Sequence, residues 1–342
     1  MAIVGEAGKA VTLMWGGFLV FVLTLLALDL GVLNKKAHTP TMKEALAFTA
    51  LTVALALAFA CFIYKAYDHH WAGLGLVADT LDHRVNDGRF ATVKFLTGYI
   101  VEMSLSMDNV FVIALIFEHL RIPRAMQHRV LFWGILGALT MRGTMIAGGA
   151  ALVTRFEWIL YLFGVFLVVT ALRMLFVKEK EEAPEESFVV YWLNKRFRVT
   201  TEFHGKQFRI TKDGKSFITP LMVALVLVET TDLIFAVDSI PAIFAITTDA
   251  FLVFTSNVFA ILCLRSLYFA LAGLIEKFRY LKMSLAAILG IVGVKMLTAK
   301  WTSSLLGDNA NFWMLGVVIA VLATGAGASM LADTRRSGDA SG

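Results

Sequence analysis

Nine long apolar segments, most of them about 20 residues in length, constrain the fold of this chain more than any other feature. A helix of that length can cross the hydrocarbon layer of a membrane. The segments are continuously apolar and do not alternate, which favours helices over a membrane β-barrel. The sequence therefore predicts an all-α polytopic membrane protein. We expect its spans at Met14–Leu33, Lys43–Tyr64, Val93–Phe117, Gln127–Ala150, Phe156–Phe176, Pro220–Thr247, Phe251–Leu274, Tyr280–Ala299 and Asn311–Leu331.

The composition agrees with this prediction. Hydrophobic residues make up 58% of the chain and charged residues 17%, against about 45–50% and about 25% in soluble domains. The net charge of +5 arises from basic residues at the ends of the apolar segments, so we expect no nucleic-acid partner. The first apolar segment is long enough to span the bilayer, and we expect it to be a membrane helix and not a cleaved signal peptide.

Lys and Arg predict the orientation, because they gather in the cytoplasmic loops of membrane proteins. If the N-terminus lies outside and the C-terminus inside, most of the Lys and Arg residues in the loops and ends of the chain fall on the cytoplasmic side. Apolar and polar residues alternate on both sides of Lys212-Asp213-Gly214, which predicts a β-hairpin within a cytoplasmic insert. That insert could equally be a solvated connector or a regulatory element. We expect five parts: two membrane helices with a periplasmic loop (1–91), a three-helix repeat (92–177), the insert (178–218), a second repeat (219–300), and a last helix with a cytoplasmic tail (301–342).

Spans 3–5 and spans 6–8 resemble each other and predict an internal repeat. Each set begins with two acids at the same spacing, continues with a helix that carries a central arginine, and ends in a basic residue followed by Met-Leu. Because three crossings is an odd number, the second copy enters the membrane from the opposite side, as in many secondary transporters. Chance similarity between apolar helices is the alternative. The matched positions are Glu102 with Asp232, Asp108 with Asp238, Asn109 with Ser239, Arg142 with Arg265, and Arg173 with Lys295.

Several ionisable residues lie within the apolar segments. Each one costs about 2.5–3.5 kcal/mol at the centre of a membrane helix, so most of them must face the interior of the bundle. Arg173 and Lys295 lie near span ends and can extend to the headgroups. Arg142 and Arg265 are central, and neutralising acids is as reasonable a role for them as direct work in transport. The acids are Asp29, Glu102, Asp108, Glu229, Asp232 and Asp238.

The polar atoms in these segments are chiefly oxygens, from carboxylates, from the amides of Asn109 and Asn257, and from hydroxyls such as that of Ser239. An all-oxygen set suits Mg²⁺, Ca²⁺ and Mn²⁺, whereas zinc and copper sites usually recruit His or Cys. Residues six apart diverge by about 120° on a helix, so Asp232 and Asp238 cannot face one ion from a straight helix. Pro241 predicts a helix break that would turn Asp238 toward such a site.

Several motifs of the two repeats are specific: Phe95-Leu96-Thr97-Gly98-Tyr99, Glu102 to Phe111, Val228-Glu229 with Asp232, Phe235 to Phe244, and Thr255-Ser256-Asn257. They resemble the TerC family of membrane proteins, most closely its Alx-type members. The resemblance implies a bacterial inner-membrane protein related to the LysE transporter superfamily and associated with manganese export, metal ion homeostasis and, from the family name, tellurium resistance. It implies an ion site on Glu102, Asp108, Asn109, Glu229, Asp232 and Asp238. From the polar and charged residues discussed above, we expect this site to be supported by Ser239, Asn257, Arg142, Arg265 and Asp29.

The leading hypothesis is therefore a Mn²⁺ exporter that works by alternating access, with protons as a candidate coupling ion and Ca²⁺ or Mg²⁺ as alternative cargoes. We expect no permanently bound cofactor and no enzyme, because the chain has no dinucleotide fingerprint and no pair of reactive cysteines. Cys61 and Cys263 lie in different apolar segments. The alternatives are a membrane scaffold that assists metallation or assembly of exported proteins, and a tellurite or stress resistance protein without direct transport. Protein partners and oligomeric state stay open.

Overall fold

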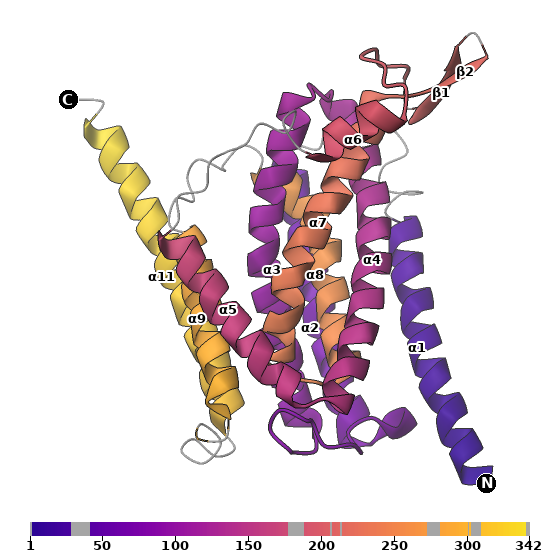
Figure 1. Ribbon diagram of the computed structural model, residues 1–342. Coiled ribbons are helices and arrows are strands. Elements are labelled where there is room, and N and C mark those ends of the chain that lie inside the picture. Colours follow the sequence, from indigo (N-terminus) through magenta and orange to yellow (C-terminus); the bar gives the residue numbers. More distant parts are fainter. Residues whose placement is uncertain are drawn as a thin grey trace.

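The computed structural model describes residues 2–28, 42–176, 188–205, 207–212, 214–271, 281–299, 301 and 309–339. Over these residues the chain forms a helical bundle (Figure 1), which confirms the all-α polytopic class. Eight of the described helices are long and apolar enough to cross a membrane, and a shorter apolar one, α9, packs beside them. The bundle helices are α1 (Ala2–Leu28), α2 (Met42–Asp68), α3 (Gly88–His119), α4 (Arg124–Arg155), α5 (Trp158–Phe176), α7 (Pro220–Phe244), α8 (Ala250–Leu271), α9 (Leu281–Leu297) and α11 (Ala310–Asp339).

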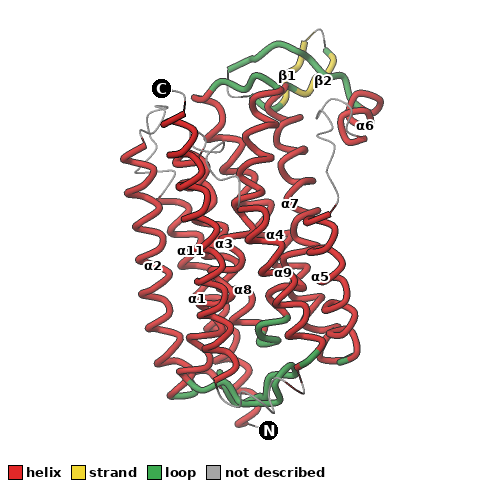
Figure 2. Tube along the Cα trace, turned by 90° about the vertical axis from the view of Figure 1, so that its left-hand side faces the viewer, coloured by secondary structure: helices red, strands yellow, loops and turns green. Residues whose placement is uncertain are grey.

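The path of the chain places its two ends on opposite sides of the bundle. The N-terminus lies at one end, and the C-terminus lies at the other end together with α6 and the two strands (Figures 1 and 2). This arrangement agrees with the predicted orientation, in which the insert and the C-terminus share a side. The identity of that side stays a prediction. For brevity, the end with the insert is called the inner end and the opposite one the outer end.

The insert is a small cap on the inner end. Strand β1 (Arg209–Lys212) pairs with β2 (Lys215–Ile218) in antiparallel register, with Lys212 opposite Lys215, so the predicted hairpin is confirmed. A short helix, α6 (Phe188–Arg196), precedes it and was not expected from the sequence. The Arg129 guanidinium at the start of α4 lies 5.0 Å from the ring of Phe208, and Ile218 is buried. The cap is therefore packed onto the bundle.

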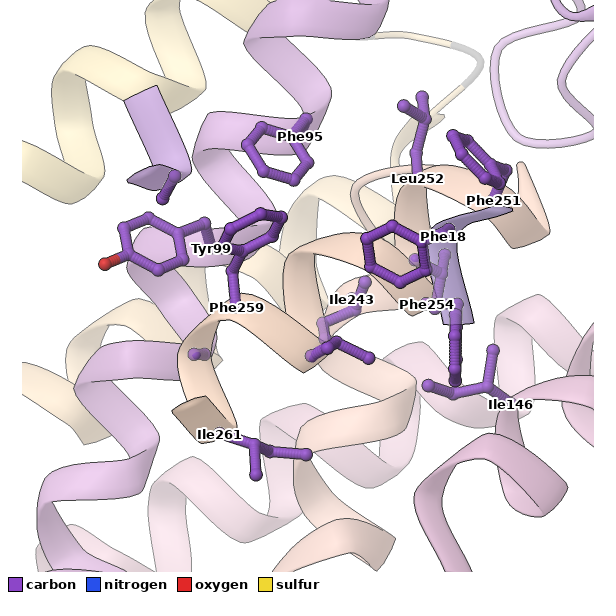
Figure 3. Packing of buried hydrophobic residues seen from close by; sticks show 14 of the residues in the cluster. Phe18, Phe95, Tyr99, Ile146, Ile243, Phe251, Leu252, Phe254, Phe259 and Ile261 are labelled. Atoms are coloured by element: carbon purple, nitrogen blue, oxygen red, sulfur yellow. The ribbon is translucent and has the colours of Figure 1, made fainter. Parts of the chain in front are cut away.

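Helix α8 occupies the centre of the bundle, between α2, α3 and α4. Its spanning segment is the most buried of the eight described spans. Aromatic rings surround it: Phe259 lies 6.0 Å from Phe95 of α3 and 6.3 Å from Phe18 of α1, measured between ring centroids. Figure 3 shows this cluster, with Phe95, Tyr99 and Phe259 close together. Burial of these large rings joins α1 to the core.

Helices α5 and α9 pack closely because both have glycine at their crossing. A Cβ atom added to Gly293 would lie 3.0 Å from the carbonyl oxygen of Gly164, too near for an unstrained contact. Small residues at such crossings let membrane helices approach, and van der Waals packing is a main source of their association. These glycines hold the third helix of one predicted repeat against the third helix of the other.

The helix pairs agree with the predicted inverted repeat. Helix α3 packs against α8 and α4 packs against α7, so exchanging the two sets of helices exchanges these contacts. Helices α3 and α7, which begin the sets, run in opposite directions along the bundle (Figure 1). The inverted repeat itself stays a prediction.

The predicted break at Pro241 is wrong. Helix α7 continues from Pro220 to Phe244, and Pro241 lies in its last turn. A proline there removes one hydrogen bond from the helix end, where few bonds remain to be lost. Because α7 is continuous, Asp232 and Asp238 face different directions, as expected of residues six apart on a straight helix.

Candidate functional site

Arg142 lies at the centre of the bundle and pairs with an acid from each predicted repeat. Its side chain, on α4, is only 2% exposed. Nη2 donates to Asp232 Oδ1 at 2.7 Å and Nε donates to Asp232 Oδ2 at 3.1 Å, so α4 grips α7 through a bidentate pair. Nη1 forms an ion pair with Glu102 of α3, which is fully buried. One arginine therefore pairs with two buried carboxylates.

Three amide and hydroxyl side chains complete this arrangement, named here the Arg142 cluster: Arg142, Glu102, Asp232, Asn109, Ser239 and Asn257. Asn109 donates to Asp232 Oδ1 at 3.2 Å. Nη1 of Arg142 lies 3.4 Å from Asn257 Oδ1 and 3.5 Å from Ser239 Oγ. Asn109 and Ser239 occupy matched positions of the two repeats, as Glu102 and Asp232 do. Each predicted repeat therefore contributes three residues to the cluster.

The Arg142 cluster retains unused hydrogen-bonding capacity. Within the described part of the chain, Glu102 Oε2 and Asn109 Oδ1 are buried and accept no hydrogen bond. A cavity of about 20 Å³ lies beside Asn109, Thr231 and Asp232. That volume admits about one water molecule or one bare ion. Asn109 lines this cavity, so its buried oxygen, which accepts no hydrogen bond, is suited to a cation there.

Three predicted ligands remain, Asp108, Glu229 and Asp238. Asp238 accepts a hydrogen bond from Thr170 of α5 at 3.4 Å. Asp108 is half-buried, six residues beyond Glu102 on α3. The Glu229 carboxylate lies against α4 at Gly137, where any Cβ would overlap it. The structure thus brings Glu102, Asn109 and Asp232 together around Arg142. Glu229 lies one helical turn before Asp232 on α7, close enough for the two carboxylates to repel each other.

Two predicted supporting residues cannot be placed. Asp29 lies outside the described residues, and the side chain of Arg265 on α8 is likewise not described. Among the residues that are described, no group of three or more His, Cys, Asp or Glu side chains is arranged to hold a metal ion. In this conformation the guanidinium of Arg142 takes the position beside the central carboxylates that a cation would need.

A second buried polar group lies at the outer end of the bundle. Lys94 of α3, only 1% exposed, donates to Asp79 at 2.9 Å and to Asn86 at 2.7 Å, and it lies 2.8 Å from Asp82. Asp79 also accepts from the hydroxyl of Thr248 at 2.6 Å. We name Lys94, Asp79, Asp82, Asn86, Thr247 and Thr248 the Lys94 cluster. It ties the loop before α3 to the turn between α7 and α8.

The charge on Asp79 is stabilised by its surroundings. Burial alone would raise its pKa, but the Lys94 ammonium and the hydroxyls of Thr247 and Thr248 outweigh burial and lower the pKa to about 2. Burial raises the pKa of the adjacent Asp249, which accepts from the Tyr67 hydroxyl at 2.8 Å. The outer end is therefore closed by charged and hydrogen-bonded groups taken from four separate segments.

Sequence reasoning missed the Lys94 cluster because it treated Lys94 as a charge at the end of a span. Asp87 caps α3, accepting from the backbone N–H of Phe90 at 2.7 Å, so the helix begins at Gly88 and buries Lys94 inside it. Asp is a common N-cap residue, so Asp87 directly before the helix was the sequence signal that α3 begins at Gly88. Lys295, expected to extend to the headgroups, instead donates to Asn311 of α11 at 3.2 Å.

Comparison with known proteins finds one matching family and several similar membrane proteins. The family described as "Integral membrane protein TerC family" matches residues 88–337. A Myxococcus xanthus protein named "Uncharacterized membrane protein STKORF319" is 47% identical over 283 residues, 83% of this chain and 82% of that protein. Proteins named "Putative membrane-bound redox modulator Alx" are 44% identical in Salmonella typhi and 45% identical in Escherichia coli K12, each over 286 residues, 83% of this chain and 85% of the relative. No solved structure matches.

Proposed function

Because this chain belongs to the TerC family of integral membrane proteins, we propose that it exports a divalent cation across the bacterial inner membrane, with Mn²⁺ as its cargo. Mn²⁺ is the ion that the family resemblance implies. The N-terminus is then periplasmic and the C-terminus cytoplasmic, as the basic residues predict. The observation that carries the proposal is that Glu102 and Asp232, matched between the repeats, share the buried Arg142.

In this proposal Arg142 is the counter-ion of the empty transporter. Two carboxylates without a cation would be costly inside a membrane, and between turnovers the guanidinium pairs with both and offsets one of their two charges. An entering cation displaces it, and Glu102, Asp232 and the Asn109 amide then provide oxygen ligands of the kind that Mn²⁺ accepts. Ser239 and Asn257 already lie within 3.5 Å of Nη1, so they can hold the guanidinium after it leaves.

The remaining acids fit positions along a route through the membrane. Six helical residues correspond to about 9 Å of rise, so Asp108 lies about 9 Å from Glu102 toward the inner end. Since α7 runs the other way, Asp238 lies about 9 Å from Asp232 toward the outer end. We propose that a cation passes from Asp108 and Glu229, through the Arg142 cluster, to Asp238. The Lys94 cluster keeps the outer end closed in the present conformation.

The test is cation flux in vesicles that contain the purified protein, followed with a trapped metal-sensitive dye. Wild type should move Mn²⁺, and parallel traces with Mg²⁺ and Ca²⁺ measure its selectivity. Asp232→Asn and Glu102→Gln should each lower Mn²⁺ flux by at least about tenfold, because each removes one charged ligand. Glu202→Gln is the matched control, since Glu202 is an exposed acid of the insert.

The results separate the proposal from its alternatives. Equal flux in Asp232→Asn, Glu102→Gln and wild type would exclude the Arg142 cluster as the transport site. Absence of flux in wild type for all three metals and in both directions of a pH gradient would favour a scaffold or a resistance protein that does not transport. A change in flux with the direction of the pH gradient would identify protons as the coupling ion.

A further inference from the structure

Helix α6 presents two opposed apolar faces. Val189, Val190 and Leu193 point toward the bundle, where Leu193 is buried and the two valines pack against the core at the inner end. Aromatic side chains lie on the opposite face at helical spacing and remain exposed in the isolated chain, Phe188 at 76%, Tyr191 at 62% and Trp192 at 48%. Three exposed aromatic rings on one outward face indicate that this face contacts lipid or another protein.

Basic residues adjoin this aromatic face. Lys195 follows Tyr191 by one helical turn, and its Nζ lies 6.0 Å from the centre of the Tyr191 ring. Arg196 and Arg198 follow, and both are exposed. Aromatic rings beside Lys and Arg characterise helices at the boundary between the headgroups and the acyl chains. A surface that combines rings with positive charge is complementary to anionic lipid.

The position of α6 agrees with that chemistry. It packs beside α7 at the inner end, and Figure 2 shows it projecting sideways from the bundle instead of lying on top of it. The spanning helices place that sideways surface next to the bilayer. The aromatic face would therefore continue the lipid-contacting surface of the bundle.

We propose that α6 lies in the inner headgroup layer and binds anionic phospholipid through Phe188, Tyr191, Trp192 and Lys195. A soluble protein partner and a second copy of this chain are the competing occupants of the same face. Charge complementarity and continuity with the lipid-contacting surface favour lipid. The inference is independent of the cargo, because it concerns the cap and not the Arg142 cluster.

The experiment measures the depth of a spin label on α6 in the full-length protein. A nitroxide is attached to Trp192→Cys in a chain that carries Cys61→Ala and Cys263→Ala, reconstituted in vesicles with or without anionic phospholipid. The control label is on Thr211→Cys, an exposed position of β1. Collision rates with dissolved oxygen, which enters lipid, and with a water-soluble nickel chelate report the surroundings of each label.

The label at position 192 should collide several-fold more with oxygen and several-fold less with the nickel chelate than the label at 211. Lys195→Glu combined with Arg196→Glu should reduce that difference only in vesicles that contain anionic lipid. Equal exposure of both labels to the nickel chelate would overturn the proposal by placing α6 in water. Protection of position 192 from both reagents would also overturn it, because it would identify a protein partner or a second copy.

Discussion

At the scale of single residues, two cationic side chains are buried among the described residues, Arg142 and Lys94, and their surroundings differ. Arg142 faces two carboxylates from matched helices and sits beside acceptors that lack donors. Lys94 faces partners whose acceptors are already filled. A filled network holds one structure, whereas an incompletely filled one can take another ligand. We therefore propose that the Arg142 cluster binds the cation and that the Lys94 cluster closes the outer end.

The ionisation of Asp79 should make the stability of the protein depend on pH. Its pKa is about 2 in the folded chain and 3.8 ordinarily, so the native state favours its charged form. This contributes about 2 kcal/mol above pH 4, which is lost as the pH falls through 2. Thermal unfolding of the detergent-solubilised protein, measured from about pH 6 down to about pH 2, should show this loss of stability in wild type. The loss should be smaller in Asp79→Asn. An identical acid dependence in the two proteins would contradict the role of Asp79.

At the scale of helices, the apolar segments predicted the spans well because length and continuous hydrophobicity are local properties of the sequence. The ends were less accurate: α3 begins at Gly88 and not Val93, and α7 is not broken at Pro241. Helix α6 was missed because its nine residues make only about two and a half turns, too few for a helical period to stand out in the sequence. The Lys94 cluster depends on contacts such as Asp79 with Thr248, 169 residues apart, which no local pattern encodes.

The crossing of α5 and α9 offers a matched test of close helix packing. Gly293→Ala should destabilise the protein by about 1–3 kcal/mol, because the new methyl group meets the Gly164 backbone, which cannot move aside easily. Gly290→Ala is the control, since its Cβ would lie 3.5 Å from Ala171 in ordinary contact. The free energy of unfolding in mixed micelles measures both. Equal losses in the two variants would show that the close approach at Gly293 is not needed for stability.

At the scale of the whole molecule, the two sets of helices meet at one buried arginine while the outer end is tied shut by the Lys94 cluster. The sequence predicted the central acids correctly as buried groups, but their partners depended on which helices pack together. The alternating access that we propose would require the turn between α7 and α8 to separate from the loop before α3. Thr80 and Thr248 lie on those two segments, with the Thr80 N–H donating to Thr248 Oγ1 at 2.9 Å.

A covalent link across that contact should therefore stop transport. Thr80→Cys with Thr248→Cys, in a chain that carries Cys61→Ala and Cys263→Ala, should lose Mn²⁺ flux on oxidation and regain it on reduction. Each single cysteine variant should be unaffected by the oxidant. Full flux in the oxidised, cross-linked protein would show that the outer end does not open at this contact.

The most direct measurement of the central claim is the Mn²⁺ dependence of thermal unfolding in Arg142→Gln and wild type. Without the guanidinium, Glu102 and Asp232 lack their counter-ion, so Arg142→Gln should be less stable than wild type by about 3–5 kcal/mol in metal-free buffer. If Mn²⁺ and Arg142 compete for the same carboxylates, Mn²⁺ should bind the variant more tightly and restore most of that loss. Adding Asp232→Asn should abolish the restoration. Equal shifts with Mn²⁺ in Arg142→Gln and wild type would contradict the account, because the metal would then bind elsewhere.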